Sequence, residues 1–378
     1  MDSFDYIIAG SGAAGLSMAY YMANDPFFDQ KKILVIDKEP KNAYDRTWCF
    51  WSDSDDFFPD VIHKKWDKIE IKTPLKKSVF PIHPYTYNLI RSNDFYQYII
   101  SLIENKKNFT IKYELIEEVR NHGTVVTNKS LYRGNYIFNS ISHPIRYKKG
   151  NITFLQHFKG WYIRTKTPVF QPDIATLMDF DIEQFDECRF CYILPISAHE
   201  AMVEYTVFSE SVLEDTVYDL LIRKYINDRF GNTEYIVTHT EFGVIPMSDV
   251  LYLSDLKSSV INIGTSGGAT KASTGYTFYF IQKQIKFYID QLKNGRIQKL
   301  YIPPYKYRLY DSVLLRVLLD KKIPAHTVFE DMFFKLKIQD VFDFLNEKST
   351  LFQDLKVMSS VNIAVFMSAM LRQIQKVK

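Results

Sequence analysis

The first residues that could do chemistry are glycines near the start of the chain. Gly10, Gly12 and Gly15 follow the pattern G-x-G-x-x-G. In nucleotide-binding turns the first glycine permits a tight bend, the second lets the backbone approach a pyrophosphate, and the third lets helix and strand pack closely. Free N–H groups at the start of the helix also attract phosphate. We therefore expect Gly10, Gly12, Ala13, Ala14 and Gly15 to bind a dinucleotide, the alternative being a glycine turn whose site is vacant.

An acidic residue ends the second predicted strand, the position from which a dinucleotide site contacts the ribose. Asp37 ends a second apolar run, about 20 residues after Gly15, where a carboxylate can accept a hydrogen bond from a ribose hydroxyl. Lys38 follows it. Both are expected to contact the nucleotide.

A second glycine-rich segment favours FAD over NAD. Gly264, Gly267 and Gly268 follow an apolar run far downstream, and Thr274 and Gly275 precede a helical pattern. A helix start beside the pyrimidine edge of a flavin would stabilise the negative charge of the reduced ring. A plain NAD dehydrogenase has no need of this late return, so these residues are expected to contact FAD.

A cluster of aromatic residues follows the second predicted strand. Arg46, Trp48 and Trp51 lie in the run D-R-T-W-C-F-W at residues 45–51. It can form an apolar wall with cation–π capacity beside the cofactor, or a hydrophobic plug with a surface arginine.

One carboxyl group is suited to acid chemistry. Glu204 lies in a strand-like run with Met202 and Thr206 on its own face. Partial burial would raise its pKa and keep it protonated near neutral pH. The alternative places it on a solvent-facing side of the sheet.

Taken in order, these segments resemble the lycopene cyclases over almost the whole chain. The resemblance rests on the run at 45–51, Q-H-F-x-G-W at 156–161, F-C-Y-I-L-P at 190–195, V-E-Y-T-x-F-S at 203–209, G-V-I-P-M at 243–247 and S-T-G-Y at 273–276. Asn139-Ser140 and Ala272 depart from residues that many relatives carry at those positions.

The resemblance implies a redox-neutral, acid/base ring closure at the ends of lycopene, through γ-carotene to β-carotene, by an intramolecular lyase or isomerase. It implies reduced FAD, with NAD(P)H as the reductant and Arg46 among the cofactor contacts. It also implies Glu204 as the acid and a substrate pocket of Trp48, Trp51, Tyr192 and Tyr276.

The elements that must position these residues form an α/β fold. A βαβ unit at the start requires a parallel sheet, and a mostly antiparallel sheet is inserted later. We expect an FAD-binding Rossmann-like domain of the two-dinucleotide-binding flavoprotein type at 1–145, a mostly β substrate domain at 146–254, the return of the FAD-binding domain at 255–300 and a C-terminal helical region at 301–378. Helices are predicted at residues 13–23 and 215–230. A further helix should begin with Ser92 or Asn93 as its cap, and a long helix after the second glycine-rich segment should end at residue 292.

Composition excludes several functions. A net charge of +3, from 47 basic and 44 acidic residues, is not that of a nucleic-acid binder. Three cysteines favour a reducing compartment. Cys188 and Cys191 should face opposite sides of a strand, and no second ligand pair exists, so no metal is expected.

No signal peptide and no apolar stretch of about 20 residues is present, so no span is expected. A carotene-binding enzyme would still contact the bilayer. We expect a cytoplasmic protein, peripheral on the inner face of the cell membrane. Segments 313–319 and 357–371 could lie at the interface, and a buried core helix fits the second equally well.

Two other functions remain open. A flavin monooxygenase or prenyl reductase of the same superfamily would consume NAD(P)H, and the absence of a Gly-Asp pair at Gly264-Thr265 counts against it. A non-catalytic carotenoid- or flavin-binding protein would not depend on Glu204.

Overall fold

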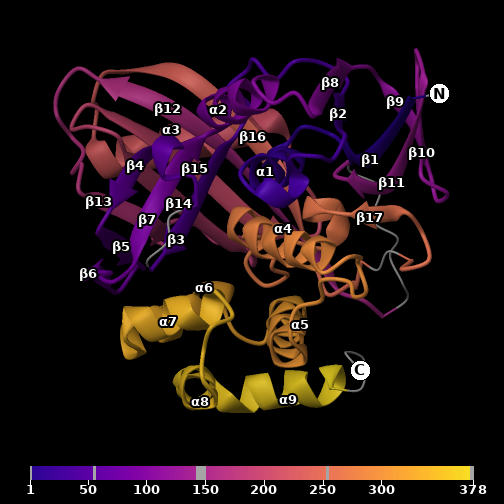
Figure 1. Ribbon diagram of the computed structural model, residues 1–378. Helices are drawn as coiled ribbons and strands as arrows, with labels where there is room; N and C mark the ends of the chain where they lie inside the picture. Colours follow the sequence, from indigo (N-terminus) through magenta and orange to yellow (C-terminus); the bar gives the residue numbers. More distant parts are fainter. Residues whose placement is uncertain (1, 54–56, 142–149, 253–254, 375–378) are drawn as a thin grey trace.

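The computed structural model describes residues 2–53, 57–141, 150–252 and 255–374 (Figure 1). Two large sheets lie side by side, with helix α4 between them and a layer of C-terminal helices on one side.

The first sheet is built around parallel strands, as the βαβ pattern predicts. Its strands are β1 (Asp2–Ala9), β2 (Ile33–Asp37), β8 (Phe109–Tyr113), β9 (Ile116–Arg120), β10 (Thr124–Thr127), β11 (Leu131–Asn139) and β17 (Val260–Asn262). β1 pairs in parallel with β2 and β11, and β11 with β17. One face packs on helices α1 (Ala13–Ala23), α2 (Ser92–Glu104) and α4 (Phe278–Lys293). This places the carboxyl ends of β1, β2 and β11 at one edge, where α1 begins.

The second sheet is mostly antiparallel. Its order is β16-β12-β15-β14-β13-β5-β6. The strands are β5 (Lys68–Lys72), β6 (Lys77–Pro81), β12 (Thr153–Thr165), β13 (Ile174–Asp179), β14 (Cys188–Pro195), β15 (Glu200–Ser209) and β16 (Tyr235–Ser248). Helix α3 (Asp215–Phe230) covers one face, where Trp161, Val203 and Tyr205 point. The residues between them therefore point to the opposite face.

Strands from the N-terminal third also reach the second sheet. β5 and β6 precede the expected boundary at residue 146, yet β5 pairs in parallel with β13. A third, small sheet has the order β3 (Thr47–Ser52), β7 (Thr86–Arg91), β4 (Ile62–Trp66), and its residues join both large hydrophobic clusters, Phe50 that of the first sheet and Trp51 that of the second. The short 3-10 turn η1 (Pro26–Phe28) precedes β2, and η2 (Pro59–Val61) directly precedes β4. The second sheet is therefore assembled from both sides of that boundary.

The C-terminal region is helical, as expected. Its helices are α5 (Tyr305–Asp320), α6 (Ala325–Lys335), α7 (Ile338–Leu345), α8 (Leu351–Ser360) and α9 (Ile363–Gln373). They form the layer drawn from orange (α5) to yellow (α9) in Figure 1. Among the described residues, none of the helices combines the length and the apolar character needed to cross a bilayer.

Two local predictions were wrong. Ser92 does not cap α2: it is already helical, Arg91 holds the cap position, and the Ser92 hydroxyl accepts instead from the backbone N–H groups of Asp45 and Arg46. Segment 313–319 is not interfacial, because Val313, Leu315, Val317 and Leu318 are buried in the core. Cys188 and Cys191 do face opposite sides, since they belong to different hydrophobic clusters.

Candidate functional site

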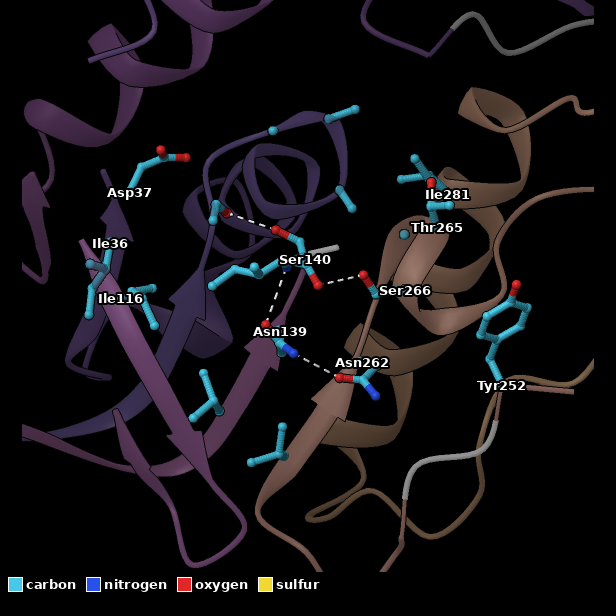
Figure 2. A pocket seen from close by; sticks show the side chains of 18 of the residues that line it. Ile36, Asp37, Ile116, Asn139, Ser140, Tyr252, Asn262, Thr265, Ser266 and Ile281 are labelled. Atoms are coloured by element: carbon cyan, nitrogen blue, oxygen red, sulfur yellow. Dashed lines mark hydrogen bonds between the residues drawn. The ribbon is translucent and has the colours of Figure 1, made fainter. Parts of the chain in front are cut away.

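A large cleft opens at the carboxyl edge of the first sheet (Figure 2). It has a volume of about 1600 Å³ and runs between the start of α1 and the 3-10 turn η3 (Gly264–Gly267). The cleft is lined by seven of the predicted nucleotide contacts: Gly10, Gly12, Ala13, Ala14, Asp37, Lys38 and Gly264.

The three glycines of the first turn have the geometry that their spacing predicts. Gly10 has φ +94°, which favours glycine. A Cβ atom on Gly15 would lie 1.9 Å from the carbonyl oxygen of Gly10, so only glycine lets α1 pack here. A Cβ on Gly12 would meet nothing within 4 Å. Gly12 therefore leaves open space where the cleft meets the start of α1, which has no side-chain cap.

Asp37 supports the turn from the next strand. Its Oδ2 accepts from the backbone N–H of Ser11 at 2.6 Å and from the Ser11 hydroxyl at 2.8 Å. Lys41 lies 3.4 Å from the other carboxylate oxygen. Lys38 pairs with Glu39 at the surface.

Asn139 and Ser140, which differ from the residues that many family members carry, make hydrogen bonds that hold the glycine turn. The Ser140 hydroxyl donates to the carbonyl oxygens of Ala9 and Gly10, at 2.9 and 3.1 Å, and the Asn139 amide donates to the side chain of Asn262 (Figure 2). These bonds tie β11 to the glycine turn and to the return strand β17.

The second glycine turn is held by one side chain of α4. Gln284 accepts from the N–H of Gly264 and donates to the carbonyl of Gly267, both at 2.8 Å. Gly267 and Gly268 line a smaller neighbouring cavity instead of the cleft. A Cβ on Gly275 would overlap the Gln156 side chain, at 1.9 Å from its Oε1.

The remaining predicted cofactor contacts lie outside the cleft lining. Arg46 is exposed and donates to the carbonyls of Asp45 and Phe242. Thr274 lines a third cavity, described below.

Glu204 is buried on the face of the second sheet that points away from α3. Only 6% of the residue is exposed, and the Thr206 hydroxyl donates to its Oε1 at 2.7 Å. Burial, helped by the nearby charge of Glu241, raises the pKa of Glu204 to about 8. The solvent-facing alternative is therefore excluded, and the side chain holds a proton near neutral pH.

Three of the four predicted pocket residues form a continuous aromatic wall beside Glu204. Tyr192 is its cross-strand neighbour and hydrogen-bonds Tyr276. Tyr276 packs edge-on against Trp51, with ring centroids 4.6 Å apart. Trp48 lies apart, stacked on Phe278 in the core of the first unit.

A second buried carboxyl group was missed by the sequence analysis. Glu241 of β16 is 6% exposed and accepts from the Thr47 hydroxyl at 2.6 Å. Burial raises its pKa to about 7. Its position two residues before Gly243 of the G-V-I-P-M block could have drawn attention to Glu241 in the sequence. Its proximity to Glu204, however, follows only from the strand register.

An apolar cavity of about 370 Å³ lies among the C-terminal helices. Its lining includes Met178 of β13, Thr274 and Tyr276 of the segment before α4, and Ile363 and Met367 of α9, which are exposed. We call it the helical cavity. Tyr276, which lines this cavity, hydrogen-bonds Tyr192, the cross-strand neighbour of Glu204. Glu204 itself lines neither the helical cavity nor the cleft.

The sheet order and the cleft at two glycine turns define the class: an α/β fold of the FAD-dependent oxidoreductase type. Solved structures share it along nearly all of both chains. A geranylgeranyl bacteriochlorophyll reductase-like protein from Thermoplasma acidophilum has a TM-score of 0.64 at 12% identity, covering 98% of this chain and 100% of the other. The flavin-dependent brominase Bmp2 has 0.63 at 15% identity, covering 99% and 100%. A mutant of the halogenase PltM, in complex with FAD, has 0.59 at 11% identity, covering 99% and 92%.

Within that class the sequence gives a narrower assignment. The family model described as "Lycopene cyclase protein" matches residues 5–374. The chain belongs to the lycopene cyclase family. No curated protein shows significant sequence similarity to it.

Proposed function

We propose that this chain is a flavin-dependent lycopene β-cyclase, which closes the ψ ends of lycopene to β rings, through γ-carotene to β-carotene, without net redox change. The observation that carries the proposal is Glu204: a buried carboxyl group, protonated near neutral pH, beside an aromatic wall in a member of this family.

The chemistry needs an acid that stays protonated until an alkene arrives. Ring closure begins when a proton adds to the terminal double bond, and it ends when a ring proton leaves. A carboxyl group whose pKa lies near the working pH can give and recover a proton efficiently. Glu204 has that property because burial disfavours its charged form.

The cation formed between those two steps must be kept from water. Trp51, Tyr192 and Tyr276 are apolar at their ring faces and can stabilise positive charge through cation–π contact. All three are buried or half-buried, so they also exclude water that would trap the cation.

The residues of the cleft fit FAD. An open Gly12, an uncapped helix start and a buried acid on the second strand are the features that a dinucleotide pyrophosphate and ribose require. Gly10, Gly12, Ala13, Ala14, Asp37 and Gly264 would hold it, with NAD(P)H as the proposed reductant. Reduced flavin supplies an electron-rich ring that can stabilise nearby positive charge.

The test is an anaerobic assay of flavin-loaded protein with lycopene and chemically reduced FAD. We expect γ-carotene and then β-carotene, with no consumption of reductant after the flavin is reduced. A product that appears only with oxygen or with stoichiometric NAD(P)H would identify a monooxygenase or a reductase instead. No cyclic product from well-folded, flavin-loaded protein would also contradict the proposal.

The substrate is a bilayer lipid, and we propose that α8 and α9 contact the membrane. Their outer surface carries a group of exposed apolar side chains, which we call the apolar patch: Leu351, Phe352, Leu355, Ile363, Met367 and Leu371. Lys348 and Arg372 flank it, each paired with a carboxylate of this chain, Asp53 and Asp320 respectively. An exposed apolar surface on two amphipathic helices suits the boundary between headgroups and acyl chains. The helical cavity would then take the polyene directly from the bilayer.

Replacing Ile363, Met367 and Leu371 with serine is expected to weaken vesicle binding by roughly tenfold or more, since each buries apolar area worth about 1 kcal/mol or more in lipid. They are 57%, 49% and 70% exposed, so the fold should not change. Flotation with phosphatidylglycerol-containing liposomes measures the effect.

A matched control removes as much exposed apolar surface elsewhere. Leu75, Leu220 and Ile236 are 87%, 67% and 61% exposed, and none lies on α8 or α9. Their replacement with serine should leave flotation unchanged. Equal losses in both triple variants would show that the patch is not the contact surface.

A further inference from the structure

Two carboxyl groups on different strands meet over a glycine of the second sheet. Gly160 of β12 stands opposite Glu204 of β15 on one side and opposite Glu241 of β16 on the other. Neighbouring strands are about 4.8 Å apart, so a side chain on the middle strand would normally separate the outer two. Gly160 has none. A Cβ there would lie 3.3 Å from Cγ of Glu241 and 3.6 Å from Cβ of Glu204, so both side chains border the space above the glycine.

We propose that Glu204 and Glu241 hold one proton between them, and that ionised Glu241 is the positioning residue that keeps Glu204 protonated. Two negative charges in one buried site repel each other, so such a pair favours a singly protonated state. The role of Glu204 and Glu241 in catalysis rests on the proposed cyclase function. Whether the two carboxyl groups share a proton does not depend on that function.

The groups next to each carboxyl group determine whether Glu204 or Glu241 carries the proton. The Thr47 hydroxyl and the charge of Arg46 both lower the pKa of Glu241 against the effect of burial. Among the described residues, Thr206 is the one whose side chain donates a hydrogen bond to Glu204, and the charge of Glu241 raises the pKa of Glu204 beyond the effect of burial. The proton therefore resides on Glu204.

Other titratable groups face the pair. Burial holds the pKa of Cys49 on β3 and of Tyr192 on β14 well above their ordinary values, so both stay neutral near neutral pH. Tyr44 and Tyr162 lie on the Glu241 side, where burial likewise raises the pKa of both. Asp45 raises the pKa of Glu241. Of these groups, Glu241 is the one that places a negative charge beside Glu204 near neutral pH.

The proton balance of the reaction closes within this arrangement. The O–H bond of Glu204 breaks as a C–H bond forms on the terminal alkene. After the carbon–carbon bond closes, a ring C–H bond breaks and the proton returns to the Glu204 carboxylate. The charge of Glu241 makes that carboxylate a stronger base, which favours the return. No electron donor or acceptor is consumed.

The experiment is an infrared pH titration of substrate-free protein, which follows the carbonyl stretch of protonated carboxyl groups. In the wild-type protein we expect a component lost with a midpoint near pH 8, and Glu204→Gln should remove it. Glu241→Gln should move that midpoint lower by about 1 pH unit, because a neighbouring negative charge is gone. Thr47 can still donate to the amide oxygen, so this variant should fold, which thermal unfolding checks.

Two further variants make the result specific. Glu200→Gln changes a carboxyl group on the same strand, paired with Arg164, and should leave the midpoint in place. Glu241→Asp keeps the charge and should restore most of the wild-type midpoint. A folded Glu241→Gln protein with an unmoved midpoint would overturn the proposal.

The catalytic consequence has its own readout. In Glu241→Gln the fall of kcat at high pH should move to lower pH by the same amount, which a merely structural role would not produce. If no cyclase activity exists, this measurement fails together with the proposed function, while the infrared titration still decides whether the pair exists.

Discussion

The Glu204→Gln variant should lose roughly 10²- to 10⁴-fold in the rate of ring closure, the range that a positioned general acid contributes. An amide cannot supply the proton. Glutamine keeps the shape of the side chain and can still accept from Thr206, so packing should be retained. Product formation under single-turnover conditions, with lycopene in detergent micelles, measures the loss. A rate within about threefold of the wild-type rate would remove Glu204 from the mechanism.

The stability of the same variant provides a check on protonation. The pKa of Glu204 is about 8 in the folded chain against 4.5 for an ordinary glutamate, so the folded state binds more protons between these values. Stability associated with this group is therefore present below pH 4.5 and is lost as pH rises through 8. The wild-type Tm should fall from about pH 6 to about pH 9 more steeply than that of Glu204→Gln. Parallel profiles would mean that Glu204 is already ionised at the lower pH.

The Gly12→Ala variant should bind FAD roughly 100-fold more weakly or worse, while the flavin-free protein keeps its Tm. The added methyl group meets no protein atom within 4 Å, and the backbone at Gly12 is extended, which alanine tolerates. The group would instead occupy the space that a pyrophosphate needs beside the helix start. Equilibrium dialysis with FAD and thermal unfolding of flavin-free protein separate the two effects.

A second glycine in the same turn provides the contrast. In Gly15→Ala the new methyl group would lie 1.9 Å from the Gly10 carbonyl oxygen, so α1 must move. This variant should lose stability as well as flavin affinity. If Gly12→Ala binds FAD as tightly as the wild-type protein does, the cleft is not a flavin site.

Local patterns could predict much of the fold. The first turn and α1 follow from glycine spacing and apolar runs, because these patterns act over a few residues. The ends of α1 and α3 lie where the sequence indicates. The apolar run before the second glycine-rich segment predicts a strand at residues 260–264, but β17 ends at Asn262, and Gly264 starts the turn η3.

The contacts within the candidate site could not be predicted from the sequence, because they join residues that are far apart in the chain. The alternation around Glu204 predicts that it shares a face with Met202 and Thr206, but not that Gly160 brings Glu241 beside it, because cross-strand register depends on the whole sheet. The cluster at residues 45–51 does not reveal that Trp51 joins Tyr276 while Trp48 packs on Phe278. Nor does composition separate the buried face of α9 from its exposed one: Ala369 is buried and Leu371 is not.

The most direct test of the acid mechanism is cyclisation in D₂O, with flavin-loaded protein, reduced FAD and lycopene under anaerobic conditions. If Glu204 exchanges with solvent and protonates the alkene, each β ring formed should gain one deuterium, with no further reductant consumed. Rings that carry no deuterium, or product whose amount tracks oxidation of the reduced flavin, would show that the bond-forming step is not proton-driven.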